Sequence, residues 1–290
     1  MKLARFTVNE HMTIGIVQGD RVVALASVLP DVPTTIREVL AAGPQLRQRI
    51  EIAMRHAPEG HALASVHLEA PIPDASKYLA IGMNYRDHAE EARRAGLPIP
   101  KTQLWFNKQV SCIHGPFDPV LIPRVSDKVD YEIELGVVIG RRCRYVTENE
   151  AQAVVGGYFV ANDVTARDWQ QASPTFTLGK SFDTHGPIGP WIVTADEVPD
   201  PHALQMRLFV NGELRQRQST GDMIYNLWQQ IHHLSQVMTL EPGDLIATGT
   251  CAGVGIASGR FLKHGDVVRA EIDGLGHIEN RFISEPAPRG

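Results

Sequence analysis

The chain has 290 residues and a mass of 32.0 kDa, enough for one large domain with a smaller one beside it. Hydrophobic residues make up 43% and charged residues 21%, which excludes a disordered or fibrous protein. The net charge of −5 provides no basic surface for nucleic acid, and no segment approaches the roughly 18 consecutive apolar residues of a membrane-spanning helix.

The cysteines and the first residues of the chain indicate in which cellular compartment the protein is expected. Cys112, Cys143 and Cys251 are an odd number at wide spacings, and the chain has no CxxC motif. This usage predicts neither a disulfide framework nor a zinc knuckle. The first residues lack the apolar segment and cleavage site of a secretion signal. We therefore expect a cytoplasmic protein that has neither a membrane nor a nucleic acid as partner.

Residues 1–72 are expected to form a small α+β domain. Three β-type segments begin it, and a turn at 18–20 joins the last two as a hairpin. Two short helices follow, the first capped by Thr34 or Thr35 and ended by Gly43-Pro44. The proline-rich segment 69–74 predicts the domain boundary. The predicted strands are residues 6–8, 13–17 and 21–25, and the second predicted helix spans 46–54.

Residues 73–290 are expected to form the main domain, which is rich in strands. Two helices are predicted here, one over 85–95 directly after a strand, and one that begins near Asp222, carries apolar residues at helical spacing and ends before Glu241. A fold class of mainly β structure with few helices follows, and a doubly wound dinucleotide-binding sheet is disfavoured. The predicted strands are residues 135–139, 157–161, 191–194, 206–210, 245–248 and 267–272.

Three carboxylates alternate along one predicted strand. Asp130, Glu132 and Glu134 share a face because side chains two residues apart point the same way in a strand. The apolar segment that follows indicates that the strand enters an interior, where uncompensated carboxylates are costly. A divalent cation would compensate them. An edge strand with a solvated acidic face remains the alternative.

A second predicted strand ends at Asp163. Glu132, Glu134 and Asp163 would form an oxygen-only set suited to Mg²⁺ or Mn²⁺, with Ca²⁺ as a non-native occupant. Zinc is disfavoured because no histidine or cysteine lies in these segments. Asp168 is interpreted as a salt-bridge or turn partner.

His88 and Glu91 lie three residues apart on the first predicted helix of the main domain, so they can hydrogen-bond. A histidine oriented by a carboxylate can act as a general base near neutral pH. Charge pairs at this spacing are also common on exposed helices, so a solvent-exposed pair without a catalytic role is the alternative. The polar, proline-bounded segment 84–100 has the character of a mobile lid.

Two lysines lie among apolar residues, Lys108 and Lys180. Each could hold a substrate carboxylate or exchange a proton beside a metal, or it could be a surface lysine with a partly covered stem. A glycine-rich loop at 248–255 lacks a P-loop lysine, so nucleotide binding is disfavoured, although its backbone N–H groups could bind a carboxylate.

Five ordered motifs together resemble the fumarylacetoacetate hydrolase (FAH) family, over roughly residues 75–285. The resemblance implies a mixed β-roll or distorted barrel, a homodimer and an Mg²⁺ or Mn²⁺ ion on Glu132, Glu134 and Asp163. The motifs are residues 82–88 (GMNYRDH), 130–135 (DYEIEL), 162–168 (NDVTARD), 179–183 (GKSFD) and 248–250 (TGT).

The resemblance also implies roles for single residues. His88 and Glu91 match a water-activating pair in the lid, and Lys180 is expected to take part in catalysis. The residues expected to bind substrate are Tyr85, Arg86, Lys108, Gln170 and Thr250.

The implied reaction is metal-dependent hydrolysis of a carbon–carbon bond in 2,4-dioxo acids, such as acylpyruvates or fumarylpyruvate-like compounds, to pyruvate and a carboxylic acid. The same site could decarboxylate oxaloacetate, or isomerise or hydrate 2-hydroxy-dienoates in aromatic catabolism. A metal-stabilised binding protein without catalytic activity is the alternative from a different class.

Overall fold

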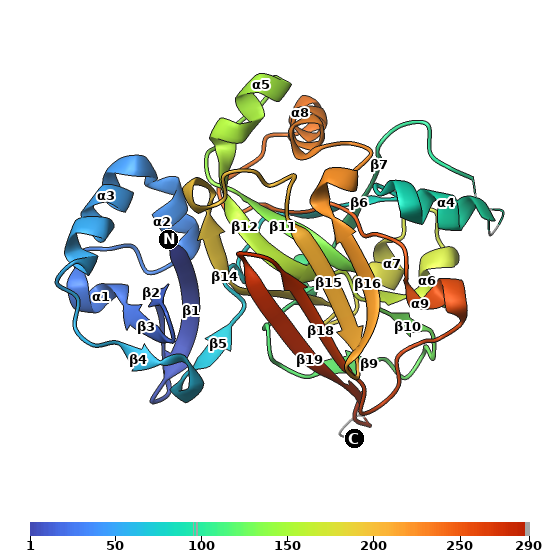
Figure 1. Ribbon diagram of the computed structural model, residues 1–290, viewed down its shortest axis with the longest axis horizontal. Coiled ribbons are helices and arrows are strands. Elements are labelled where there is room, and N and C mark those ends of the chain that lie inside the picture. Colours follow the sequence, from blue (N-terminus) through green and yellow to red (C-terminus); the bar gives the residue numbers. More distant parts are fainter. Residues whose placement is uncertain (95, 97, 288–290) are drawn as a thin grey trace.

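The computed structural model describes residues 1–94, 96 and 98–287. In this part of the chain, a 12-stranded mixed sheet contacts a five-stranded sheet through β11, β12 and β14. Figure 1 shows the five-stranded sheet lying across the middle of the larger one. The predicted fold class, mainly β with few helices, is confirmed.

The N-terminal elements extend the large sheet. β1 pairs antiparallel with β14 of the main domain, Lys2 opposite Val193, and β2, β3 and β4 follow outward in the order β1-β2-β3-β4. The division at residue 72 remains a prediction. The bounds are β1 Lys2–Val8, β2 His11–Gln18, β3 Arg21–Ala24, β4 His61–Ala62, β5 His67–Glu69, α1 Leu25–Val28, α2 Ile36–Ala41 and α3 Gly43–Met54.

Local sequence signals account for the ends of these helices. The hydroxyl of Thr35 accepts a hydrogen bond from the backbone N–H of Glu38, so Thr35 is the residue that caps α2. Gly43, at φ +76°, turns the chain after α2, and Pro44 then lies in the first turn of α3. The predicted break at Gly43-Pro44 is therefore confirmed, and this break is also where the next helix begins.

β11 is an inner strand of the large sheet, between β12 and β17. All seven of its residues are buried, and all except Glu134 are uncharged and non-polar, as expected for a strand covered on both faces. Other strands of the large sheet lie on either side of β11. The bounds are β6 Tyr78–Gly82, β7 Leu104–Lys108, β8 Ile113–His114, β11 Ile133–Ile139, β12 Val155–Asn162, β14 Gly186–Thr194 and β17 Leu245–Ala247.

The five-stranded sheet has the order β16-β15-β18-β19-β9. Its inner side chains pack on those of β11 and β12 to form the main hydrophobic core. A two-stranded pair, β10 with β13, lies apart from both sheets. The bounds are β9 Val120–Ile122, β10 Val129–Asp130, β13 Thr165–Ala166, β15 Gln205–Val210, β16 Glu213–Ser219, β18 Val267–Ile272 and β19 Gly276–Ser284.

Both predicted helices of the main domain are present, as α4 and α8, and residue 95, the predicted end of the first, lies outside the described residues. The predicted start of the second helix near Asp222 is wrong: Asp222 ends a separate 3-10 turn, and the helix begins at Leu227, where the Asn226 side chain caps it. Among the described residues of the main domain, four helices of four or five residues were not predicted, because they are too short for apolar periodicity. Across the described ranges, no helix is long and apolar enough to cross a membrane. The bounds are α4 Arg86–Arg94, α5 Glu148–Ala151, α6 Arg167–Gln171, α7 Thr177–Lys180, α8 Leu227–Val237 and α9 Gly255–Ser258.

Candidate active site

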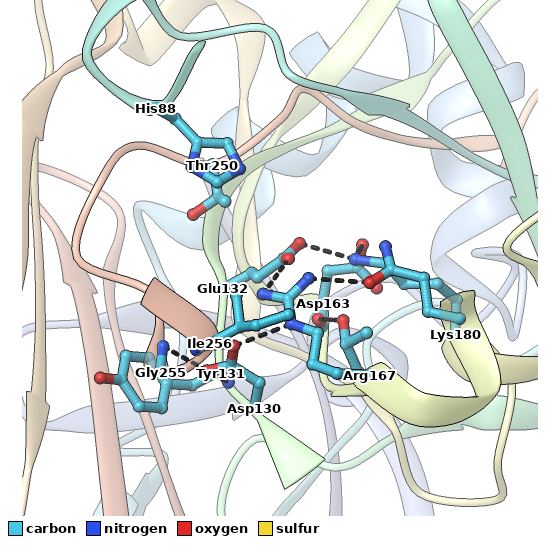
Figure 2. Close-up of polar contacts among 12 residues, drawn as sticks. His88, Asp130, Tyr131, Glu132, Asp163, Arg167, Lys180, Thr250, Gly255 and Ile256 are labelled. Carbon is cyan, nitrogen blue, oxygen red and sulfur yellow. Dashed lines mark hydrogen bonds and ion pairs between the residues drawn. The ribbon is translucent and has the colours of Figure 1, made fainter. Parts of the chain in front are cut away.

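A pocket of about 1200 Å³ opens at the end of the large sheet. Its walls come from α4, the ends of β6 and β7, helices α6 and α7, and the segment 250–257. His88, Glu132 and Lys180 all line it, although they are far apart in the sequence. Figure 2 shows His88 on one side and the cluster around Glu132 and Lys180 on the other.

Three buried carboxylates meet in this region. Oxygen atoms of Glu132, Glu134 and Asp163 all lie within 4.8 Å of one another. Glu132 precedes β11, Glu134 is its second residue, and Asp163 directly follows the adjacent strand β12. A hydrogen bond of 2.8 Å from the backbone N–H of Asp163 to the carbonyl of Glu132 fixes the two segments side by side. The three residues predicted as metal ligands therefore come together, and a solvated acidic edge is excluded.

Two cations line the pocket beside these carboxylates. Lys180 Nζ lies 2.6 Å from Glu132 Oε2 and 2.7 Å from Asp163 Oδ2. The guanidinium of Arg167 pairs with the other Glu132 oxygen, at 2.7 Å. Figure 2 shows these ion pairs converging on Glu132. Burial alone would raise the pKa of Glu132, but Lys180 and Arg167 lower it below its ordinary value.

Lys108 lies beneath the pocket, fully buried. Its ammonium contacts Asp163 Oδ1 at 2.6 Å and the carbonyl of His185 at 3.0 Å, and it also donates to the carbonyl of Lys180. Burial disfavours the charged ammonium, yet Asp163 raises the pKa of Lys108 above its ordinary value. Lys108 therefore orients Asp163 from below. Both lysines are buried, so the alternative of surface lysines is wrong.

Glu134 is the least compensated of the three carboxylates. It accepts a hydrogen bond of 2.8 Å from the N–H of Gly249. Burial, together with the nearby Asp163 and Glu132, raises its pKa well above the ordinary value. Three converging carboxylate oxygens with excess negative charge suit a hard divalent cation. The residues present thus fit the predicted class of metal site.

Asp130 precedes Glu132 by two residues, in the same alternating series of acids as Glu134, but its carboxylate has different partners. Its carboxylate binds Arg167 at 2.8 Å and accepts hydrogen bonds from the backbone N–H groups of Gly255 and Ile256 at the start of α9. It anchors Arg167, which the sequence motif contained but to which no role was assigned. Asp168 accepts a hydrogen bond from the Ser126 hydroxyl at 2.6 Å, a turn partner as expected.

The pair His88 and Glu91 lies on the inner face of α4. His88 Nδ1 is 3.0 Å from Glu91 Oε2, and both side chains line the pocket. In the neutral imidazole, a carboxylate partner at Nδ1 favours the tautomer with the proton on Nδ1, which leaves a lone pair on Nε2. This is the orientation a general base requires. Because both side chains line the pocket, the alternative of a charge pair on a solvent-exposed helix surface does not apply.

The remaining predicted substrate-binding residues fall into two groups. Gln170 and Thr250 line the pocket. Tyr85 is buried in the core, where its hydroxyl lies 3.7 Å from the sulfur of Met206, and Arg86 is mostly exposed beside Asp222. Tyr85 and Arg86 do not belong to the described lining of the pocket.

An aromatic wall was not predicted from the sequence. Phe106 and Phe176 line the pocket and contact each other edge to face, with ring centroids 5.9 Å apart. Lys180 Nζ lies 5.1 Å from the centroid of the Phe106 ring. Phe176 has φ +61°, an uncommon conformation for a bulky residue. No local pattern could have indicated this wall, because its members lie 70 positions apart.

Fold and site together define a class of protein, an enzyme built around a buried acidic centre on a mixed sheet. A family model described as "Fumarylacetoacetate (FAA) hydrolase C-terminal" matches residues 77–283, most of the chain. The chain belongs to the FAH family of enzymes.

Relatives and solved structures agree with this assignment. The mitochondrial oxaloacetate tautomerase fahd2 of Xenopus laevis is 40% identical, over 98% of this chain and 90% of its own length. Maleylpyruvate hydrolase from Sphingobium sp. SYK-6, in complex with manganese(II) ion and pyruvate, has a TM-score of 0.84, 34% identity and coverage of 99% and 100%. A 2-hydroxyhepta-2,4-diene-1,7-dioate isomerase from Mycobacterium marinum has a TM-score of 0.77, 31% identity and the same coverage.

Proposed function

We propose that this protein is a divalent-metal-dependent hydrolase that cleaves 2,4-dioxo acids of the acylpyruvate type into pyruvate and a carboxylic acid. One observation carries the proposal. An oriented histidine base, His88, lines the same pocket as Glu132 and Glu134, and Asp163 converges with these two carboxylates. Hydrolysis needs both an activated water and a charged centre that holds the keto acid.

Glu132, Glu134 and Asp163 would hold Mg²⁺ or Mn²⁺. When bound, such a cation would hold a 2-oxo acid by its carboxylate and keto oxygens and neutralise negative charge that develops there. Manganese in the structure of the Sphingobium maleylpyruvate hydrolase supports this choice.

The side chains supply the proton and charge transfers. His88 Nε2 takes a proton from water, and the hydroxide adds to the 4-oxo carbon. The C3–C4 bond then breaks, and its electron pair stays on the pyruvate fragment as an enolate. The Lys180 ammonium stabilises this negative charge. A water then protonates C3 to complete pyruvate beside the released acid, and the hydroxide formed takes back the proton held by His88, which restores the base.

The apolar side of the pocket suits the acyl group. Besides the aromatic wall, aliphatic side chains from β6, β7 and the segment after α4 face the same space. A pocket of about 1200 Å³ holds far more than the pyruvate fragment. The aliphatic lining residues are Ile81, Leu104, Pro98, Ile99 and Pro100.

Oxaloacetate tautomerase is the second candidate. The 40% identity to the Xenopus laevis tautomerase covers almost the whole chain, which favours this activity. Tautomerisation moves a proton between C3 and the 2-oxo oxygen of the keto acid and breaks no carbon–carbon bond. The same lysine and histidine could serve it without an activated water.

A substrate panel separates the two candidates. Protein loaded with Mn²⁺ is incubated with acylpyruvates of increasing acyl length and with oxaloacetate, and both pyruvate release and enol absorbance are followed. We expect pyruvate from the acylpyruvates. Loss of oxaloacetate enol absorbance, with acylpyruvates left intact, would instead assign the tautomerase.

Replacing the base tests the assigned role. We expect His88→Ala to lower kcat for acylpyruvate hydrolysis by about 10²-fold or more, because general bases contribute 10²–10⁴-fold. Decarboxylation of oxaloacetate needs no activated water, so it should fall far less. Equal losses in both reactions would contradict the role of His88.

A further inference from the structure

Helix α4, which carries His88 and Glu91, has little apolar anchorage. Of its nine residues, Ala89 and Ala92 are the buried ones. Hydrophobic burial therefore contributes little to its position, and polar contacts must hold it over the pocket. The acidic side chains on its inner face make these contacts.

Asp87 ties the first turn of α4 to strand β16. Its Oδ2 accepts a hydrogen bond of 3.0 Å from Gln218 Nε2. Its Oδ1 accepts from the backbone N–H of His88 at 2.7 Å and of Ala252 at 3.3 Å. Both carboxylate oxygens are thus used, and the Gln218 side chain is in turn fixed because its Oε1 accepts from the N–H of Ser219 at 2.9 Å.

Glu91 has a second contact besides His88. Its Oε1 accepts a hydrogen bond of 3.3 Å from the N–H of Gly253. Gly253 adopts φ +100°, and a side chain there would meet the carbonyl of Arg215 in β16 at 2.1 Å. The loop that touches Glu91 is therefore pressed against the same strand that binds Asp87.

Gln216, two residues before Gln218, fixes this loop to the acidic centre. Its Nε2 donates to Thr250 Oγ1 and to the carbonyl of Cys251, each at 2.9 Å. Its Oε1 accepts from the N–H of Ile133, between Glu132 and Glu134, at 3.0 Å. Residues two apart in a strand share a face, so one face of β16 holds both halves of the site.

We propose that Gln218 and Asp87 are positioning residues that hold α4 closed and keep His88 directed at the acidic centre. Neither residue takes part in the proton transfers. The amide–carboxylate bond between them sets where the base lies. Only the kinetic consequence of this inference rests on the proposed function, because the contact itself is a property of the protein without substrate.

Exchanging the two groups tests the contact. Asp87→Asn leaves an oxygen for His88 and Ala252 but turns an amide N–H₂ toward the Gln218 amide. Gln218→Glu sets a second carboxylate against Asp87. The double variant D87N/Q218E restores one donor and one acceptor with the direction reversed and the net charge unchanged. A double-mutant cycle therefore isolates the bond.

Hydrogen–deuterium exchange of the full chain without substrate is the first measurement. We expect each single variant to speed exchange in residues 86–94 about tenfold, the size expected for a lost hydrogen bond to a charged group. The double variant should return to within about twofold of the original protein. Unchanged exchange in the single variants, or no recovery in the double variant, would overturn the inference.

Steady-state kinetics on acylpyruvates are the second measurement. We expect kcat to fall about tenfold in the single variants, with KM within about twofold, the same melting temperature and recovery in the double variant. Gln205→Glu, at an exposed glutamine in the same sheet, is the matched control and should change nothing. A loss of kcat that follows a fall in melting temperature, without recovery, would indicate a merely structural contact.

The two measurements separate this inference from the proposed function. If the unmodified protein cleaves no 2,4-dioxo acid, the hydrolase assignment fails, and the exchange measurement still decides whether Gln218 and Asp87 hold α4. If the protein is an active hydrolase but exchange is insensitive to both residues, the positioning role fails by itself.

Discussion

Charge balance at single residues shapes the centre of this enzyme. Four buried carboxylates, Asp130, Glu132, Glu134 and Asp163, face three buried cations, Lys108, Arg167 and Lys180. With all seven ionised the cluster carries −4 + 3 = −1. A bound dication would change this to +1, which suits an anionic keto acid. Burial and the neighbouring carboxylates raise the pKa of Glu134, so without a cation this carboxyl favours its neutral form, and a bound dication would instead stabilise it ionised.

Removing one ligand tests the metal site. We expect Glu132→Gln to weaken Mn²⁺ binding by at least about 100-fold, the upper range for loss of an outer-shell partner alone, and to abolish metal-dependent turnover. The fold should persist, because glutamine has nearly the same shape. Calorimetric titration with Mn²⁺ measures the affinity, and Glu148→Gln on the exposed face of α5 is the control. Unchanged affinity would contradict the assignment, and lost stability without any turnover in the unmodified protein would favour a binding protein.

A buried histidine makes stability depend on pH. His185 is fully buried, and its Nε2 donates to the carbonyl of Leu121 at 2.9 Å. Burial lowers the pKa of His185 from 6.5 to about 3. Because the pKa is lower in the folded state, its contribution is complete above pH 6.5 and is lost as the pH falls toward 3.

We expect His185→Gln to remove this dependence. Between about pH 6 and pH 4, the free energy of unfolding of the unmodified protein should fall more steeply than that of the variant, by about 1.4 kcal/mol per pH unit for one proton. Urea unfolding at several pH values measures the difference. Parallel curves would show that His185 does not titrate in this way.

At the scale of elements, β11 sets the geometry of the acidic centre. It pairs with β12 along its whole length, and this register places Asp163 beside Glu132 and Glu134. Gly136 lies opposite Phe159, and a Cβ at Gly136 would meet the Phe159 ring at 2.2 Å. The aromatic ring fills the space above the glycine, so the two residues are a packed pair.

We expect Gly136→Ala to lower the free energy of unfolding by about 1–3 kcal/mol, the usual effect of overpacking a core. The loss should be smaller in a Phe159→Leu background, because the shorter side chain leaves room for the methyl group. Chemical unfolding of the two single variants and the double variant measures this coupling. Strictly additive losses would contradict the packing argument.

At the scale of the whole molecule, the N-terminal segment and the main domain share structure. β1 continues the sheet from β14, and one hydrophobic cluster contains Leu3 and Leu40 together with Phe159 and Ile192. The predicted boundary at residue 72 therefore divides the sequence, but the strands on its two sides belong to one continuous sheet. Continuity of this kind couples their stability.

We expect residues 73–290 alone to be less stable than the full chain and prone to aggregation, because removal of β1 uncovers the edge of β14 and part of a core. Thermal unfolding and light scattering of the fragment measure this. A soluble fragment with an unchanged melting temperature would show that the N-terminal segment is an independent domain.

Sequence patterns were sufficient where the information is local. The alternation of acids at 130–134, the acid that ends β12 and the three-residue spacing of His88 and Glu91 each depend on backbone geometry, so they indicated the carboxylate cluster and the pair on α4. Hydrophobic periodicity likewise predicted α8. One-turn helices and several strands were missed, among them β7, β9, β16 and β19. β9 has only three residues, β16 is largely polar, and turns leave no periodic signal.

The sequence by itself determined the strand-rich class and indicated which carboxylates and which histidine are proposed for the site, because each follows from side-chain chemistry and short-range geometry. Only the tertiary structure decided that Lys108 lies beneath Asp163, that Asp130 anchors Arg167 and that Gln218 holds α4 through Asp87. These contacts join residues 37 to 131 positions apart. Such pairings are set by packing of the whole chain, which no local pattern encodes.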